Sequence, residues 1–410
     1  MTASPRIALL MHSVLPRGGV VHTLELAGAL AAAGTAVDVL APVEPGQALF
    51  RPLPSGVGWV PLAVPAPRAN GLAEQVGQRI DALVQALPAA LQRCGYALLH
   101  AQDSLNGQAL ARLAPAQPWV RTVHHLDDFS DPRLAAWQDG AWRAASAVCC
   151  VSDLWARQLR ALAGPEGPPV HRVFNGVALD RFHPGPVAGD AALLHQQLPE
   201  GDGLDEAPFI LAVGGVEARK NSARLLQAFA RLRQHPSFHR ARLVLAGGAS
   251  LLSHGAEQAR WQAALDEAGL AEGPRQPVWR TGPLPDALMP ALMRRARLLA
   301  MPSLNEGFGL VALEALACGT PVLVSRRAPF TEHLDGSPGV SWCEPEDLAS
   351  LTQGLARAWH APRRDTAPPV CQRLAWGRSA QVHRTVYARV LARHPADAPS
   401  SAPCLPFSHF

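Results

Sequence analysis

The sequence predicts an α/β protein built from two doubly wound domains that face each other across a cleft. Short apolar runs of strand length alternate with helical patterns, which is typical of parallel sheets covered by helices. The alternation begins near residue 6 and begins again at Phe209, after a stretch rich in Pro, Gly and Asp. A chain of 410 residues also exceeds one ordinary hydrophobic core, which favours two domains.

Composition indicates a globular protein and excludes several classes of function. The chain is 48% hydrophobic and 17% charged, so it is not expected to be disordered. A formal net charge of +4, without a run of basic residues, is too small to indicate nucleic-acid binding. Seven cysteines, an odd number, do not indicate a disulfide framework and suit a reducing cytoplasm. Because no apolar run reaches the roughly 18 residues of a membrane span and no signal-peptide pattern is present, we expect a cytoplasmic protein, with at most peripheral membrane contact.

The expected domain boundaries follow from the points where the alternation stops and restarts. The segments are a first domain at 1–184, a linker at 185–207, a second domain at 208–369, a terminal helix at 370–393 and a mobile tail at 394–410.

Two helices of the first domain carry clear local signals. Ser152 is predicted to cap a helix over residues 153–163, because its hydroxyl can accept a hydrogen bond from an amide of the first turn. The helical pattern over residues 74–94 contains Pro88, and we expect this helix to be broken or capped there.

A pair of glycines follows the first predicted strand. The strand ends near Met11, and Gly18 and Gly19 stand in a turn before a helical pattern over residues 20–33. The pair lacks the G-x-G-x-x-G spacing of a dinucleotide site. It either lets a ligand approach the backbone or forms a turn with no further role.

A pair of histidines ends another predicted strand, over residues 119–125. His124 and His125 stand at the carboxyl end of this strand, where open α/β sheets bind ligands. Each is either a ligand contact or a satisfied structural histidine. Two adjacent imidazoles also suggest a metal site, but no third Cys or His has the spacing to complete it.

The stretch from Pro302 to Pro321 is the most informative part of the second half. It reads as a strand end, a glycine turn, a helix and the start of the next strand. The glycines let backbone amides approach a ligand, and the amides that open the helix form a cradle for an anion. Glu306 in the loop and Glu314, about two turns into the helix, are predicted to border one pocket. The structural alternative is a helix cap and a solvated carboxylate.

The loop that follows the strand over residues 209–213 contains Arg219 and Lys220. Lys220 is the only lysine in the chain, and the other 36 of the 37 basic residues are arginine. A chain that otherwise uses arginine, yet keeps lysine here, suggests a site that needs a compact ammonium on a flexible stem. The alternative is that this single lysine is present by chance and has no role in a site.

The segment from Pro302 to Val322 resembles the nucleotide-sugar-binding segment of retaining glycosyltransferases of family 4, which have the GT-B fold of two Rossmann-like domains. The resemblance extends over roughly residues 6–393 and is more specific in the second half. It implies a sugar contact for Glu306, a diphosphate contact for the loop amides and the basic pair, and a ribose contact for Glu314. The diphosphate-contacting residues would be Gly307, Phe308, Gly309, Leu310, Arg219 and Lys220.

In the first half the same resemblance implies further roles. Gly18 and Gly19 match a paired glycine that lets the N-terminal domain approach the donor phosphates. His124 matches a sugar-contacting histidine at a strand end, with His125 as the alternative. The tripeptide Asn175-Gly176-Val177 is similar to the signature that closes the first domain, and the terminal helix is expected to cross back onto that domain.

The function that the resemblance implies is transfer of a sugar from a nucleotide-diphosphate sugar to a small-molecule, glycan or lipid acceptor, with retention at the anomeric carbon. No metal or other cofactor is expected. The catalytic residues would be His124, Glu306, Arg219 and Lys220. Two alternatives are a sugar-nucleotide 2-epimerase of the same architecture and a non-catalytic nucleotide-sugar-binding partner of another transferase.

Overall fold

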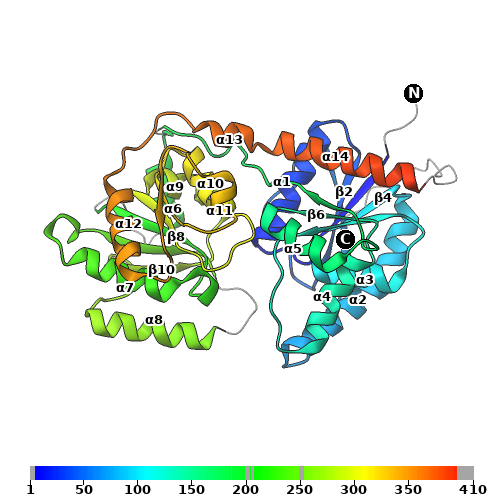
Figure 1. The fold of residues 1–410 in the computed structure, drawn as a ribbon, viewed down its shortest axis with the longest axis horizontal. Helices are drawn as coiled ribbons and strands as arrows, with labels where there is room; N and C mark the ends of the chain where they lie inside the picture. Colours follow the sequence, from blue (N-terminus) through cyan, green and yellow to red (C-terminus); the bar gives the residue numbers. More distant parts are fainter. Residues whose placement is uncertain (1–4, 186, 199–203, 205–206, 249–253, 395–410) are drawn as a thin grey trace. The chain divides into compact units, whose positions relative to one another are not determined.

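The computed structural model describes residues 5–185, 187–198, 204, 207–248 and 254–394. The chain divides into two compact units (Figure 1). The first unit contains the chain up to Gly176 and the helix that begins at Trp376, and the second unit spans Val177–Ala375.

The first unit is built on a seven-stranded sheet of the described residues, in which every pair of neighbours is parallel. The strand order is β3-β2-β1-β4-β5-β6-β7. The strands are β1 Ile7–Leu10, β2 Val37–Val43, β3 Val57–Ala63, β4 Leu98–Ala101, β5 Trp119–Val123, β6 Ala147–Cys150 and β7 Val170–Arg172. The helices are α1 Gly18–Ala32, α2 Leu72–Cys94, α3 Ser104–Leu113, α4 Pro132–Arg143, α5 Asp153–Ala163 and α14 Trp376–Arg393.

The second unit repeats this design on a parallel six-stranded sheet, in the order β10-β9-β8-β11-β12-β13. Its strands are β8 Phe209–Val213, β9 Arg242–Ala246, β10 Val278–Gly282, β11 Leu298–Met301, β12 Val322–Ser325 and β13 Val340–Cys343. Its helices are α6 Asp190–Gln197, α7 Ser222–Arg233, α8 Gly255–Ala268, α9 Met289–Arg295, α10 Leu310–Ala317, α11 Phe330–His333, α12 Leu348–His360 and α13 Pro369–Arg373. The prediction of two doubly wound α/β domains is therefore confirmed.

The central strands β1 and β11 are continuous apolar runs, as expected for parallel strands that helices cover on both faces. All four residues of β1 and all four of β11 are buried. Ser152 caps α5 as predicted, with its hydroxyl accepting a hydrogen bond of 3.4 Å from the Trp155 amide. Pro88 lies inside α2 and does not break it. The buried residues Leu83, Leu87 and Leu91 pack that helix on the core on both sides of the proline, and this packing outweighs the lost hydrogen bond.

The boundaries between the units differ from those predicted. The first unit ends at Gly176 and not at residue 184, and the predicted linker contains α6, which packs on α9 of the second unit. A buried ion pair fixes α6 there, because Arg294 Nε lies 2.6 Å from Asp190 Oδ2. The remaining part of that linker, at 199–203 and 205–206, and the predicted tail from residue 395 lie outside the described residues.

The predicted helix over residues 370–393 is two helices, α13 and α14. The chain leaves helical geometry at Leu374, and Ala375 pairs with Val177 in an isolated bridge. The Val177 amide donates to the Leu374 carbonyl at 2.8 Å. The two passages of the chain between the units are thus hydrogen-bonded to each other, and α14 packs on α1 of the first unit (Figure 1).

Five of the cysteines are free and buried, namely Cys149, Cys150, Cys318, Cys343 and Cys371. In the described part of the chain, no helix combines the length and the apolar composition needed to cross a membrane.

Candidate active site

The predicted site residues follow strands at the carboxyl edges of the two sheets. In each sheet the strand order reverses direction next to the first strand of the unit, between β1 and β4 and between β8 and β11. Open α/β sheets bind ligands outside the carboxyl ends of the strands at such a switch point. The glycine pair follows β1, the Arg219–Lys220 pair follows β8 and the Glu306 loop follows β11.

In the first unit, Gly18 and Gly19 form the first turn of α1 and not a loop before it. The helix begins two residues earlier than predicted, which places the amides of both glycines at its N-terminus. A Cβ built on Gly19 would lie 3.7 Å from Nε2 of His124, whereas nothing lies within 4 Å of one built on Gly18. The structure therefore brings Gly19 and His124 together.

The two histidines after β5 lie in different surroundings. The imidazole of His124 packs edge-on against His22, with ring centroids 4.7 Å apart, and burial holds the pKa of His124 well below its usual value. His124 is therefore neutral at pH 7. His125 is exposed, and its Nε2 lies 3.4 Å from Oδ1 of Asp127. Which of them contacts a sugar stays a prediction.

One group of the described residues has the side chains and spacing of a metal site, and it contains neither His124 nor His125. It consists of His100, Cys149 and His383, which are all buried. Both ring nitrogens of His100 are already hydrogen-bonded, Nδ1 to the Tyr387 hydroxyl at 2.6 Å and Nε2 to the Thr122 hydroxyl at 2.7 Å. Both nitrogens of His100 are thus occupied by hydrogen bonds within the core that packs against α14.

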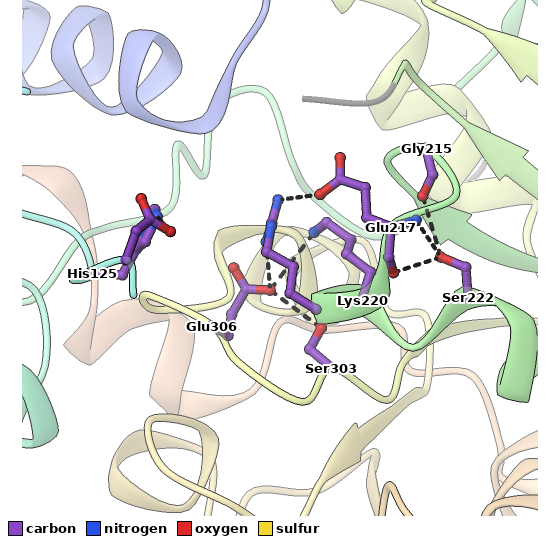
Figure 2. A network of polar contacts seen from close by, with 9 residues as sticks. His125, Gly215, Glu217, Lys220, Ser222, Ser303 and Glu306 are labelled. Carbon is purple, nitrogen blue, oxygen red and sulfur yellow. Dashed lines mark hydrogen bonds and ion pairs between the residues drawn. The ribbon is translucent and has the colours of Figure 1, made fainter. Parts of the chain in front are cut away.

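In the second unit, Arg219, Lys220 and Glu306 come together as predicted. The Oε2 atom of Glu306 lies 3.6 Å from Nζ of Lys220 and 3.8 Å from Nη1 of Arg219 (Figure 2). Both cations end a short 3-10 helix, Ala218–Lys220, which precedes α7. Gly214 leaves room for the side chain of Lys220, because a Cβ at position 214 would lie 3.0 Å from Lys220 Cε. Its φ of 118° is also a conformation that favours glycine.

Three further residues hold this arrangement, and the sequence analysis did not find them. Asn221, with a left-handed φ of 60°, donates through Nδ2 to the Pro302 carbonyl at 3.2 Å. The Ser303 hydroxyl donates to Oε2 of Glu306 at 3.2 Å. Glu217 lies 2.9 Å from Nη2 of Arg219. In the sequence, the one signal for these three residues was an asparagine immediately before α7. Asparagine is enriched in the left-handed conformation that Asn221 adopts.

The loop from Gly307 to Leu310 turns the chain into α10. Gly309 is the N-cap of α10, in a left-handed conformation, and it has no side chain with which to cap the helix. The Gly309 carbonyl accepts from the amides of Ala312 and Leu313 at 3.0 and 3.4 Å. The amides just before them are those that a helix N-terminus presents to an anion.

The side chains around this turn differ in their surroundings. Phe308 is buried and stacks on His333, with ring centroids 4.4 Å apart. Glu314 is the fifth residue of α10, one turn into the helix and not two, and it is half-buried. A cavity of about 20 Å³ lies beside Lys220 and Ser303, with room for about one water, and neither Glu306 nor Glu314 lines it.

Replacing Gly309 by alanine should destabilise the second unit. The Cβ would lie 2.3 Å from Cε1 of Phe330, at a φ of 89° that disfavours side chains. We expect a loss of about 1–3 kcal/mol in the free energy of unfolding, measured by urea denaturation. Gly18→Ala is the control, because its Cβ would meet nothing within 4 Å, and a change within about 0.5 kcal/mol is expected. Equal stability of the two variants would contradict the packing described here.

Comparison with known proteins places this chain in one family. Residues 16–181 match the model of Glycosyltransferase Family 4, and residues 197–367 match that of Glycosyl transferases group 1. A D-inositol 3-phosphate glycosyltransferase of Xylanimonas cellulosilytica is 30% identical, over 96% of this chain and 99% of the relative. D-inositol 3-phosphate glycosyltransferase 2 of Catenulispora acidiphila is 31% identical, over 72% of this chain and 71% of the relative.

Solved structures share the fold. Sucrose-phosphate synthase from Thermosynechococcus elongatus has a TM-score of 0.76 and 25% identity, covering 95% of this chain and all of the other. Alr3699/HepE from Anabaena, solved in complex with UDP-glucose, has a TM-score of 0.67 and 20% identity, covering 94% of this chain and all of the other. The chain thus belongs to glycosyltransferase family 4, the retaining sugar transferases with the GT-B fold.

Proposed function

We propose that this enzyme transfers a sugar from a nucleotide-diphosphate sugar to a phosphorylated polyol or sugar, with retention. The observation that carries the donor assignment is the convergence of Arg219 and Lys220 on one carboxylate oxygen of Glu306. Two cations and a helix N-terminus suit a diphosphate, and a carboxylate beside them suits the sugar that the diphosphate carries. The similarity to D-inositol 3-phosphate glycosyltransferases and to sucrose-phosphate synthase supports the acceptor class.

The proposed chemistry uses these groups in one step. The bond between the anomeric carbon and the diphosphate oxygen breaks, and Lys220, Arg219 and the first amides of α10 stabilise the negative charge that develops on the diphosphate. The acceptor oxygen bonds to the same face of the anomeric carbon, and its proton passes to the departing phosphate oxygen. Glu306 balances the positive charge on the sugar, Glu314 holds the ribose and neutral His124 contacts the transferred sugar. No metal takes part in this proposal.

The experiment that tests the function begins with a thermal-shift screen of nucleotide diphosphates and their sugars. A ligand at 100 times its Kd should add roughly 2.7 kcal/mol of stability. Each stabilising donor is then incubated with inositol phosphates and sugar phosphates in buffer containing EDTA, and the product linkage is determined by NMR. Conversion of the donor sugar without any acceptor would indicate an epimerase. Binding without conversion would indicate a non-catalytic partner protein. The assay is cytosol-like and reducing, because we propose a cytoplasmic enzyme and five of its cysteines are free.

Lys220→Ala should weaken binding of the nucleotide diphosphate with little loss of stability. Lys220 pairs with one carboxylate that keeps Arg219 and Ser303 as partners, so a change within about 0.5 kcal/mol in unfolding free energy is expected. Removing a charged hydrogen-bond donor should reduce affinity by about tenfold or more, measured by calorimetric titration. Arg297→Ala, in a loop before β11, is a control that removes a cation from the same unit. Unchanged affinity in Lys220→Ala would remove its phosphate role.

A further inference from the structure

Glu217 is a charged residue at a place where the second unit gives it little contact with water. Its side chain is 3% exposed, compared with 36% for Arg219 and 14% for Glu306. A buried carboxylate is stable only with a charged or hydrogen-bonding partner. Arg219 supplies such a partner, with Nη2 2.9 Å from Oε2 of Glu217. Glu217 therefore contacts the Arg219 guanidinium from the interior of the second unit.

Hydrogen bonds of the surrounding loop fix the position of Glu217. Its amide donates to the Ser222 hydroxyl at 3.2 Å, and that hydroxyl donates to the Gly215 carbonyl at 3.2 Å (Figure 2). The Lys220 amide donates to the Glu217 carbonyl at 3.1 Å. The segment from Gly215 to Ser222 is thus closed on itself, and the carboxylate projects from a fixed backbone.

Arg219 carries this constraint to the loop that holds Glu306. The amides of Leu304 and Asn305 both donate to the Arg219 carbonyl, at 2.7 and 3.3 Å. In its side chain, Nη1 of Arg219 lies 3.8 Å from Oε2 of Glu306. Main chain and side chain of one residue therefore fix both the loop and its carboxylate. The charges alternate in sign from Glu217 through Arg219 and Glu306 to Lys220.

We propose that Glu217 is a positioning residue of the transfer reaction, which holds the Glu306 carboxylate in place through Arg219. This rests on the proposed function, because it concerns the reaction in which Glu306 takes part. Neutralising Glu217 lets the Arg219 head group turn toward Glu306 or into solvent. Turnover then falls, because a reacting geometry tolerates small displacements poorly. Donor binding falls less, since Lys220 and the α10 amides remain and a negative charge near the diphosphate has been removed.

The test compares Glu217→Gln, which keeps the shape of the side chain, with Glu257→Gln. Glu257 is another buried carboxylate of the second unit, which accepts from the Ala223 amide at 3.0 Å and lies 3.5 Å from Arg260. The first measurement needs no donor. Because Lys220 is the only lysine, reductive methylation with ¹³C-formaldehyde gives one lysine signal in the NMR spectrum and keeps the charge.

We expect the Lys220 signal to shift in ligand-free Glu217→Gln and to stay at its wild-type position in Glu257→Gln. An unshifted signal in Glu217→Gln would overturn the positioning role. Titrating UDP, GDP and ADP in turn into the methylated wild-type protein tests the proposed donor site separately. A wild-type signal that none of the three moves counts against the proposed function, whereas the ligand-free comparison still decides the coupling between Glu217 and the Glu306–Lys220 pair.

The second measurement separates turnover from binding. In Glu217→Gln we expect kcat to fall by about tenfold or more, with the Kd for the nucleotide diphosphate within about threefold of wild type. Glu217→Asp keeps the charge on a shorter stem and should recover part of kcat. A kcat equal to that of Glu257→Gln, or weaker donor binding with unchanged kcat, would overturn the proposal.

Discussion

Glu306→Gln is expected to lower kcat by a factor on the order of 10² to 10³ while leaving donor binding intact. Glutamine keeps the length of the side chain and can still accept the hydrogen bond from Ser303, so the loop should stay in place. It cannot balance positive charge on the transferred sugar. Because Lys220 and Arg219 lose a competing carboxylate, the affinity for the nucleotide diphosphate should stay equal or increase. Kinetics and calorimetric titration of the same preparation measure both quantities.

The control for this variant is Glu344→Gln, which neutralises an exposed carboxylate of the same unit near Arg326. It should behave as wild type in both measurements, since surface pairs contribute little. The structural alternative for Glu306, a helix cap, predicts near-wild-type kcat in Glu306→Gln, because glutamine can still accept a backbone hydrogen bond. Near-wild-type kcat in Glu306→Gln would defeat the catalytic assignment, even though the enzyme is a transferase.

The regular elements could be predicted closely because buried parallel strands and capped helices have strong local signals. The strand Phe209–Val213 and the helix Asp153–Ala163 have the predicted bounds. Errors arose where contacts distant in sequence decide the outcome. The break before Trp376 depends on the bridge between Ala375 and Val177. No residue near the break indicates in the sequence that Val177 will pair there.

The site was partly predictable for a similar reason. Glu306 and Lys220 stand in glycine-rich loops at strand ends, and topology brings such loops together at one edge of a sheet. Glu217 was not found, because a glutamate in a polar loop carries no mark of its burial. The surroundings of His124 could not be predicted from the sequence either. Its partner His22 lies on α1, about a hundred positions earlier in the sequence, and only packing brings the two rings together.

Packing around α14 gathers histidines whose protonation should unfold part of the first unit in acid. His22 and His383 are buried, and desolvation lowers their pKa values to about 3 and about 4. Burial also holds the pKa of His100 well below its usual value, and the charge of buried Arg121 acts in the same direction. Trp376 and Tyr387 pack α14 against these rings, with centroids of 5.3 Å from His22 and 5.5 Å from His100.

The sign of the effect follows from proton uptake. In the unfolded chain these imidazoles titrate near 6.5, whereas in the folded unit they stay neutral to much lower pH, so the unfolded state binds more protons below 6.5. Stability is therefore complete above pH 6.5 and is lost as the pH falls toward the folded values. At pH 5, His22 and His383 should each cost about 2 kcal/mol, which is a large part of the stability of a domain.

We expect the opening free energy of α14 amides, measured by hydrogen exchange and corrected for intrinsic rates, to fall steeply between pH 7.5 and pH 5. In His383→Gln the decrease should be smaller by about 2 kcal/mol, because one proton-binding group is removed from the unfolded state. His394→Gln is the matched control, since His394 is exposed at the end of the same helix and its replacement should leave the decrease unchanged. Equal decreases in wild type and His383→Gln would show that this buried imidazole does not couple protonation to the docking of α14, and the acid sensitivity would then have to arise from groups outside this cluster.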